Sequence, residues 1–254
     1  ALFGASLVGL LGALPPALLA TVAGTALLGS TAGALGIALV GEQDRLAATG
    51  VTLADFRACP MCSPTRAGLL TGRWPLRFGL MRAVVPPWSR YGIPAEEDTL
   101  PELLANAGYR QRAMVGKWHL GHSRREQLPL ANGFTRFYGH YNGAIDYFTL
   151  ERDGERDWHD DDRTSRDSGY STDLIGAEAV RLVQRAPTDE PWLVYVPFNA
   201  PHGPYQAKDE DLKKYPKLEG DRRAYAAMVD SMDQAVGRIL AAVDARRDTA
   251  NTLV

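Results

Sequence analysis

The stretch CSPTRAGLLTGR, residues 62–73, determines how the rest of the chain is interpreted. Pro64 suits the first turn of a helix and Gly72 suits its end, so a short helix from Cys62 through Leu70 is expected. The cysteine then lies at the helix N-terminus, where unpaired N–H groups and the positive end of the helix dipole favour an anion. Arg66, four residues on, lies on the same face of the helix. The pattern predicts a reactive side chain that faces an anionic ligand.

Two further polar clusters follow expected strands. Lys117 and His119 stand in the run GKWHLGH, residues 116–122, and His202 stands in NAPHGP, residues 199–204. A lysine offers a compact cation for an anion, and a histidine can move protons near neutral pH. Ligands of open α/β sheets bind at the carboxyl ends of the strands. His202 is therefore expected to reach the ligand and to donate a proton or hydrogen bond.

From residue 42 onward, helical and strand patterns alternate. The expected helices span residues 43–49, 98–107, 172–185 and 222–245, and the expected strands span 51–56, 110–115, 192–198 and a last one that begins at 252. The helix at 98–107 opens with cap residues Asp98 and Thr99 and ends at Gly108. Alternation of this kind predicts an α/β fold on a mostly parallel sheet flanked by helices.

Composition excludes two classes of protein. The chain has 254 residues and a formal net charge of −2, without the basic excess of an electrostatic nucleic-acid binder, so no nucleic-acid partner is expected. Its only cysteines are Cys59 and Cys62, which excludes a disulfide-stapled secreted scaffold. The 45% hydrophobic content is enough for a sizeable core.

Residues 1–41 carry no charged side chain and form a segment distinct from residues 42–254. The segment is longer than the roughly 20 apolar residues that span a bilayer. One interpretation is a secretory leader or a membrane anchor, with Pro15 and Pro16 breaking the helix, although the basic flank of a signal peptide is missing. The other is an apolar artefact of a mispredicted gene start. The first predicts membrane association and a periplasmic, secreted or membrane-anchored protein.

The motifs themselves resemble those of a known family. Residues 62–73 resemble the sulfatase signature, C-x-[PA]-S/T-R followed by a short apolar helix and Thr-Gly-Arg, and GKWHL resembles the second sulfatase signature. The run GHYNGAIDY, residues 139–147, is similar to arylsulfatase-B-type relatives, which makes His140 and Asp146 candidates for the substrate pocket. The resemblance covers residues 42–254. It implies the alkaline-phosphatase-like architecture, here as a partial catalytic domain.

The resemblance implies a specific chemistry. In sulfatases a formylglycine-generating enzyme, which would read Pro64 and Arg66 here, oxidises the signature cysteine to an aldehyde, formylglycine. One hydroxyl of the aldehyde hydrate attacks the sulfur of a sulfate monoester, and the second expels the sulfate. Carried over, position 62 is the nucleophile, and Arg66 and Lys117 stabilise charge. His119 accepts the proton of the diol, and His202 assists the leaving group.

The family's metal ligands have no counterpart here. Sulfatases bind Ca²⁺ or Mg²⁺ through an Asp-Asp pair after their first strand and an Asp-Asn pair after the strand that follows the long helix. This chain has no aspartate before Asp44, which falls in an expected helix, and it stops at Val254. Hard cations need several oxygen ligands, and only the formylglycine oxygen at position 62 remains of the implied set.

Two alternatives to an active sulfatase stay open. In one, the chain is a catalytically inactive fragment or a membrane-anchored remnant of a sulfatase. In the other, it is a thiol redox protein that uses the Cys59-x-x-Cys62 motif at a helix N-terminus. The acidic run at residues 160–162, next to His159, is either a metal site or a solvated loop, and the loop is favoured. His122 is expected to be structural.

Overall fold

The computed structural model describes residues 41–53 and 55–254. The apolar segment 1–41 lies outside the described residues except for Gly41, and so does its interpretation as a leader or anchor. No helix within the described ranges is long and apolar enough to cross a membrane.

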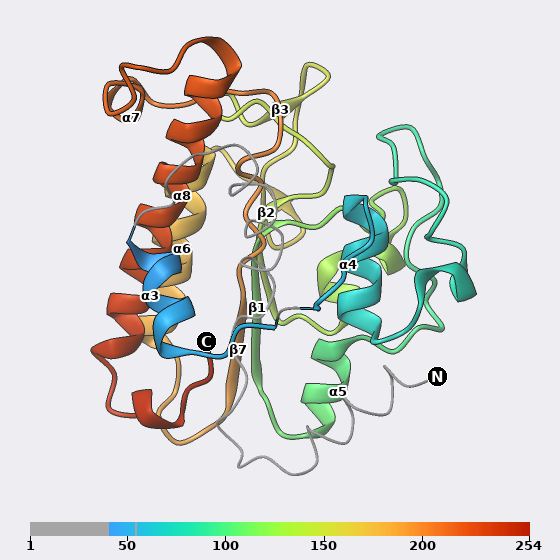
Figure 1. Ribbon diagram of the computed structural model, residues 1–254. Coiled ribbons are helices and arrows are strands. Elements are labelled where there is room, and N and C mark those ends of the chain that lie inside the picture. The colour runs from blue at the N-terminus through green and yellow to red at the C-terminus, as the bar shows by residue number, and fades with distance from the viewer. Residues whose placement is uncertain (1–40, 54) are drawn as a thin grey trace.

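The described chain forms three layers around one main sheet, which confirms the predicted α/β class (Figure 1). The strands lie in the order β6-β5-β2-β1-β7. The central strands β1 (Gln111–Lys117), β2 (Arg136–His140) and β7 (Trp192–Tyr195) are parallel. The short strands β5 (His159–Asp160) and β6 (Arg163–Thr164) continue the sheet antiparallel. A separate hairpin joins β3 (Glu151–Arg152) to β4 (Glu155–Arg156).

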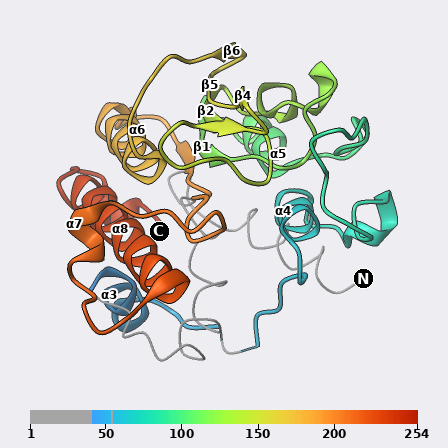
Figure 2. The ribbon, with the colours of Figure 1, turned by 90° about the horizontal axis from the view of Figure 1, so that it is seen from above.

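Helices cover both faces of the sheet (Figure 2). The long helices α6 (Ser171–Arg185) and α8 (Gly220–Asp244) lie on one side with α3 (Glu42–Thr49) and the short α7 (Asp209–Leu212). On the other side lie α4 (Cys62–Thr71) and α5 (Leu100–Asn106). Short 3-10 turns occur at η1 (Pro75–Phe78), η2 (Arg125–Gln127), η3 (Pro129–Asn132) and η4 (Thr249–Asn251).

The helix ends follow from local chemistry. Thr99 and Glu102 form a reciprocal capping box at the start of α5, as the cap residues predicted. Gly72 ends α4 in the left-handed conformation, with its N–H on the carbonyl of Gly68. Between α6 and α8, a Cβ on Gly176 would come within 2.8 Å of the Cβ of Ala235, so the glycine permits their close packing. All five predicted helices are confirmed to within a few residues.

Three strand predictions need correction. Residues 51–53 and 55–56 form no strand, and Val51 and Leu53 are 88% and 61% exposed, because no neighbouring strand pairs with them. The strand at 192–198 ends at Tyr195, since the chain bends at Val196 and the Phe198 N–H bonds back to the Val196 carbonyl. Residues 252–254 are not a strand either: Thr252 donates its N–H and its hydroxyl to the preceding turn.

Two glycines allow β1 and β2 to lie side by side near their carboxyl ends. Gly116 and Gly139 are register partners, with φ of 132° and 147°, where residues with a Cβ are strained. A Cβ on Gly139 would come within 2.1 Å of the carbonyl oxygen of Gly116, and one on Gly116 within 2.3 Å of that of Pro197. The approach of these backbones fixes the segments that carry Lys117 and His140.

We therefore expect Gly139→Ala to lower the free energy of unfolding by about 3 kcal/mol or more, because both strain and a backbone clash are introduced. Gly154→Ala is the matched control: Gly154 also has positive φ, at 87°, but a Cβ there meets nothing within 4 Å. The control should cost only about 1–2 kcal/mol. Urea denaturation of both variants measures the difference, and equal losses would contradict the close approach.

Candidate active site

The helix α4 presents Cys62 at its first residue. Met61, the N-cap, is extended and gives no side-chain cap, so the first N–H groups of the helix remain available to a ligand. Thr65 donates its hydroxyl to the carbonyl of Cys59 at 2.7 Å, and Ser63 accepts the N–H of Val85 at 3.0 Å. These bonds hold the turn that carries a half-buried, free cysteine, as the signature predicted.

His119, just beyond β1, lies directly against this cysteine. Its Nδ1 is 3.1 Å from the Sγ of Cys62, and its Nε2 is 2.9 Å from the carbonyl oxygen of Val85. A carbonyl can only accept, so Nε2 carries the proton and Nδ1 has a free lone pair. Burial first, and then the charge of Lys117, lower the pKa of His119 to about 2. His119 is thus a neutral base aimed at position 62.

The backbone around His119 is shaped to admit its ring. His119 has φ of 61°, in the left-handed region, and its N–H donates to the carbonyl of Tyr141 at 3.0 Å. A Cβ on Gly143 would lie 2.2 Å from the imidazole, so only glycine leaves the ring its space. Strain of this kind persists where the surrounding structure fixes it, and it places the imidazole beside the helix.

Lys117, the last residue of β1, is 2% exposed, and its ammonium interacts with the Cys62 side chain. Burial and the nearby charge of Arg66 lower the pKa of Lys117 to about 7, while Cys62 acts in the opposite direction. The guanidinium of Arg66 donates a hydrogen bond to the main-chain carbonyl of Lys117 and so joins α4 to β1. Two basic side chains therefore lie next to Cys62 without a carboxylate partner among the interactions of the described residues.

His202 approaches the same region from the loop after β7. Its ring Nδ1 lies 2.7 Å from the Gly203 carbonyl, so Nδ1 carries the proton and Nε2 is left free. Tyr147 donates its hydroxyl to the His202 carbonyl at 2.8 Å and steadies the loop. The pKa of His202 is lowered, first by partial burial of its ring and then by the charge of Lys117. Unlike His119, His202 is an exposed residue.

Asp146 and His140, the two residues predicted to line the substrate pocket, make contacts within the protein. Asp146 accepts the N–H groups of Phe148 and Thr149 and the side-chain amide of Gln206, so it closes a turn. His140 is completely buried, with no hydrogen-bond partner for either ring nitrogen, and it stacks on Trp158. Burial lowers its pKa to about 3. His140 is thus closed off from solvent, whereas Asp146 is half-buried.

Sequence reasoning missed Asp157 and Val85. Asp157 accepts the N–H groups of Tyr141 and Asn142, and also bonds Nε2 of His159, so it fixes the segment beside His119. Its pKa is lowered by these hydrogen bonds against the effect of burial. Val85 acts through its main-chain N–H and carbonyl only, and no sequence pattern predicts such a role. A single aspartate outside every quoted motif gave no signal either.

The redox alternative loses support from Cys59. Both cysteines are free thiols, and the Sγ of Cys59 is 3.8 Å from the sulfur of Met81. Burial raises the pKa of Cys59, whereas a redox-active thiol needs a lowered pKa. The surroundings of Cys59 therefore do not favour the redox alternative.

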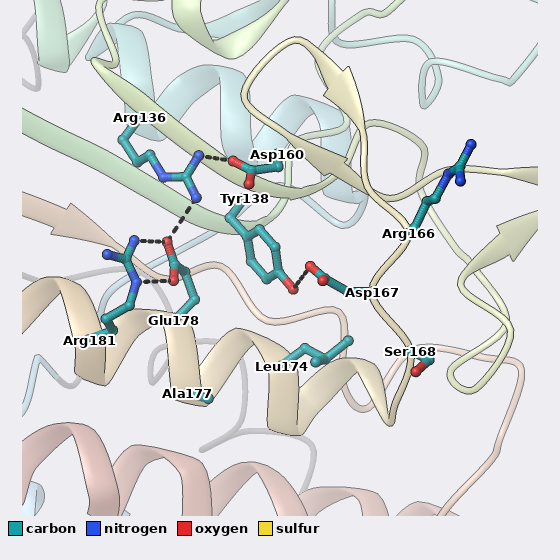
Figure 3. A pocket seen from close by; sticks show the side chains of 10 residues that line it. All are labelled: Arg136, Tyr138, Asp160, Arg166, Asp167, Ser168, Leu174, Ala177, Glu178 and Arg181. Atoms are coloured by element: carbon teal, nitrogen blue, oxygen red, sulfur yellow. Dashed lines mark hydrogen bonds and ion pairs between the residues drawn. The ribbon is translucent and has the colours of Figure 1, made fainter.

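A separate hollow of about 730 Å³ lies between β2, β5 and α6 and contains none of the predicted catalytic residues (Figure 3). Its charges are largely paired: Arg136 with Asp160 and Glu178, and Arg181 with Glu178. The prediction of a solvated loop is wrong for Asp160, which belongs to β5 and pairs with Arg136. Across residues 41–53 and 55–254, no group of three or more His, Cys, Asp or Glu side chains could hold a metal ion.

Comparison with known proteins agrees with these features. The Sulfatase family model matches residues 32–254. Mouse N-acetylgalactosamine-6-sulfatase is 35% identical over 232 residues, covering 83% of this chain and 43% of that protein. Mouse arylsulfatase J is 32% identical over 209 residues, covering 79% of this chain and 35% of that protein. The chain thus spans less than half the length of these relatives.

A solved structure gives the fold. Ps i-CgsB, crystallised in complex with k-i-k-neocarrahexaose, superposes with a TM-score of 0.70 and 31% identity, over 76% of this chain and 46% of that one. The architecture is therefore the alkaline-phosphatase-like fold expected from the motifs, represented by part of its length.

The lowered pKa of Lys117 predicts a pH effect on stability. Since its pKa is about 7 in the folded chain and about 10.4 when unfolded, the unfolded state binds more protons between these values, and stability rises with pH through that window. Lys117→Met should remove this rise. Between pH 7 and 9 we expect the wild type to gain about 2 kcal/mol relative to the variant.

Urea denaturation of the unmodified chain at both pH values, with a chelator present, measures the gain. Lys213→Met, at an exposed lysine, is the control and should follow the wild type. A wild-type curve parallel to that of Lys117→Met would show that the buried ammonium keeps its ordinary pKa.

Proposed function

The chain belongs to the sulfatase family, and we propose that the protein hydrolyses a sulfate monoester through a formylglycine made from Cys62. The observation that carries the proposal is the Sγ of Cys62 at the N-terminus of α4, 3.1 Å from the free lone pair of His119 and in contact with Lys117. In this structure the thiol stands in for a hydroxyl of the aldehyde hydrate.

The proposed reaction has two steps. In the first, one hydroxyl of the hydrate loses its proton to water and attacks the sulfur, and the bond from the sulfur to the alkoxide oxygen breaks. The exposed ring of His202 takes up a proton from solvent on Nε2 beforehand and donates it to the leaving alkoxide. In the second, Nδ1 of His119 accepts the proton of the remaining hydroxyl, the bond from that carbon to the sulfate oxygen breaks, and the aldehyde re-forms with release of sulfate. Water then rehydrates the aldehyde. General acid–base catalysis at each step typically contributes 10²–10⁴-fold.

Lys117 and Arg66 supply the positive charge for the sulfate. A sulfate beside Lys117 raises the pKa of the buried ammonium again, because an opposite charge favours the protonated form. The site is thus charged when the anion is bound. The main-chain N–H groups at the start of α4 add donors that need no reorganisation during the reaction.

Sulfatases generally use a divalent metal in addition, and position 62 is the ligand expected here. The described residues offer no cluster of carboxylates, histidines or cysteines that fits Ca²⁺ or Mg²⁺. The residues present among 41–53 and 55–254 therefore do not fit such a metal ion.

The proposal extends to partners, substrate and location. A formylglycine-generating enzyme would modify Cys62; Ser63 and Pro64 are buried, so it would meet the motif before the chain folds. A sulfated saccharide is the proposed substrate class, supported by the names of N-acetylgalactosamine-6-sulfatase and of the carrageenan oligosaccharide complex. We place the protein in the periplasm, outside the cell or at a membrane.

Cys62→Ala in the full-length protein, coexpressed with the modifying enzyme, should abolish turnover of 4-nitrophenyl sulfate. Cys62→Ser should allow one round of attack and then stop, because serine lacks the second hydroxyl that expels sulfate. Stopped-flow product release and mass spectrometry of the tryptic peptide measure both effects. Cys59→Ala is the control and should keep wild-type turnover. Sustained turnover by the alanine variant would eliminate the formylglycine mechanism.

His202→Asn should distinguish leaving groups. For a sulfated sugar, whose alkoxide needs a proton, we expect kcat to fall about 100-fold or more. For 4-nitrophenyl sulfate, whose phenolate leaves without protonation, the loss should be less than about tenfold. Equal losses for both esters would assign His202 a binding role instead.

A further inference from the structure

The loop from Arg82 to Tyr91 carries an unusually exposed tryptophan. Trp88 is 83% exposed, although an indole is among the side chains that gain most from burial. The backbone turns there, with the N–H of Ser89 on the carbonyl of Pro86 at 2.9 Å, and Trp88 stands inside this turn. Nothing in the predicted catalytic machinery uses it.

The base of this loop is tied to the active site. Val85 donates its N–H to Ser63 next to the nucleophile, and its carbonyl accepts Nε2 of His119. The carbonyl of Pro87 accepts a hydrogen bond from Nε2 of His122 at 2.8 Å. Three residues of chain reach at most about 11 Å, so Trp88 lies within about two sugar rings of Val85 and the catalytic histidine.

The other side of the loop is held as well. Tyr91 donates its hydroxyl to the carbonyl of Val84 at 2.8 Å, and Gln127 donates its amide to that of Arg90 at 3.2 Å. In Figure 1 the turquoise loop after η1 rises beside α4 toward the end of the molecule where α4 begins and β1 ends. The indole is therefore displayed on a fixed loop at the end of the molecule that holds Cys62.

The charged residues of the loop and its neighbouring sequence are all positive. From residue 56 to residue 95 the sequence contains six arginines and no acidic residue. Two of them, Arg82 and Arg90, flank Trp88 and are exposed, and among the described residues neither side chain forms an ion pair. A guanidinium binds sulfate or carboxylate through two parallel N–H groups. An aromatic face between two such groups complements a sugar ring that carries an anion.

We propose that Trp88, Arg82 and Arg90 form an outer subsite that binds the sugar neighbouring the one whose sulfate is hydrolysed, in a multiply sulfated saccharide chain. The indole stacks on the sugar ring, and the arginines pair with a second sulfate or a carboxylate on it. The proposal rests on the proposed function for the identity of the reacting sulfate. It predicts a preference for oligosaccharides over monosaccharides and simple aryl sulfates.

The test compares Trp88→Ala with Trp74→Ala in the full-length protein. Trp74 is also exposed, at 56%, but follows the far end of α4, about 15 Å from Cys62 along the helix. Binding is measured by calorimetry with sulfated hexasaccharides of the carrageenan and glycosaminoglycan types, their desulfated forms and the sulfated monosaccharides. Turnover of 4-nitrophenyl sulfate and the melting temperature are followed in parallel.

We expect Trp88→Ala to weaken binding of the preferred sulfated hexasaccharide by 10-fold or more, with Trp88→Tyr restoring most of it. Aryl sulfate turnover and the melting temperature should stay within twofold and a few degrees of the wild type. Arg82→Gln and Arg90→Gln should weaken binding of the sulfated form but not of the desulfated form. Trp74→Ala should change none of these quantities.

Two results would overturn the subsite: a wild type that binds every hexasaccharide no more tightly than the matching monosaccharide, or equal affinities for Trp88→Ala and Trp74→Ala. Failure of the proposed function looks different. A protein without sulfatase turnover that still loses hexasaccharide affinity on Trp88→Ala has the subsite but not the activity.

Discussion

The site depends on one link between two layers of the fold: the guanidinium of Arg66 on α4 bonded to the carbonyl of Lys117 at the end of β1. This bond sets the start of the helix against the end of the strand, which brings Cys62 and His119 to 3.1 Å. It also brings the charge of Arg66 near Lys117, whose pKa falls to about 7, first through burial and then through that charge. Burying these like charges together costs free energy in the free protein, and a bound anion relieves that cost, so the site favours an anion over a neutral ligand.

The sequence predicted those parts of the site that sit at element ends. A cysteine before Pro64, and a lysine at the end of an apolar strand, are placed by local rules for helices and strands, and Gly72 marks the helix end for the same reason. Functional groups in such positions need no knowledge of distant contacts. The roles of the catalytic residues stay predictions until the variants are measured.

The remaining features depend on long-range packing. Residues 51–56 have a strand-like composition, yet a strand needs a partner, and the pattern says nothing about one. His140 resembled a pocket residue but is enclosed, because β2 lies between β5 and β1 in the sheet and the imidazole stacks on Trp158. Val85 contributes through its carbonyl, and a carbonyl is common to all residues. The overexposed Trp88 is equally invisible in sequence, where a tryptophan suggests core.

Val85 connects the proposed catalytic base, His119, to the exposed loop through hydrogen bonds. Its carbonyl fixes the tautomer of His119, and its N–H is held by Ser63, one residue from the nucleophile. A change in the loop that moved Val85 would break the hydrogen bond from Nε2 of His119 to the Val85 carbonyl. The Nδ1 lone pair would then no longer be held toward position 62. Trp88 makes no hydrogen bond to the catalytic residues among the described contacts, so its side chain can vary without this penalty. Substrate preference can therefore change at the tip of the loop while the catalytic geometry at its base is kept.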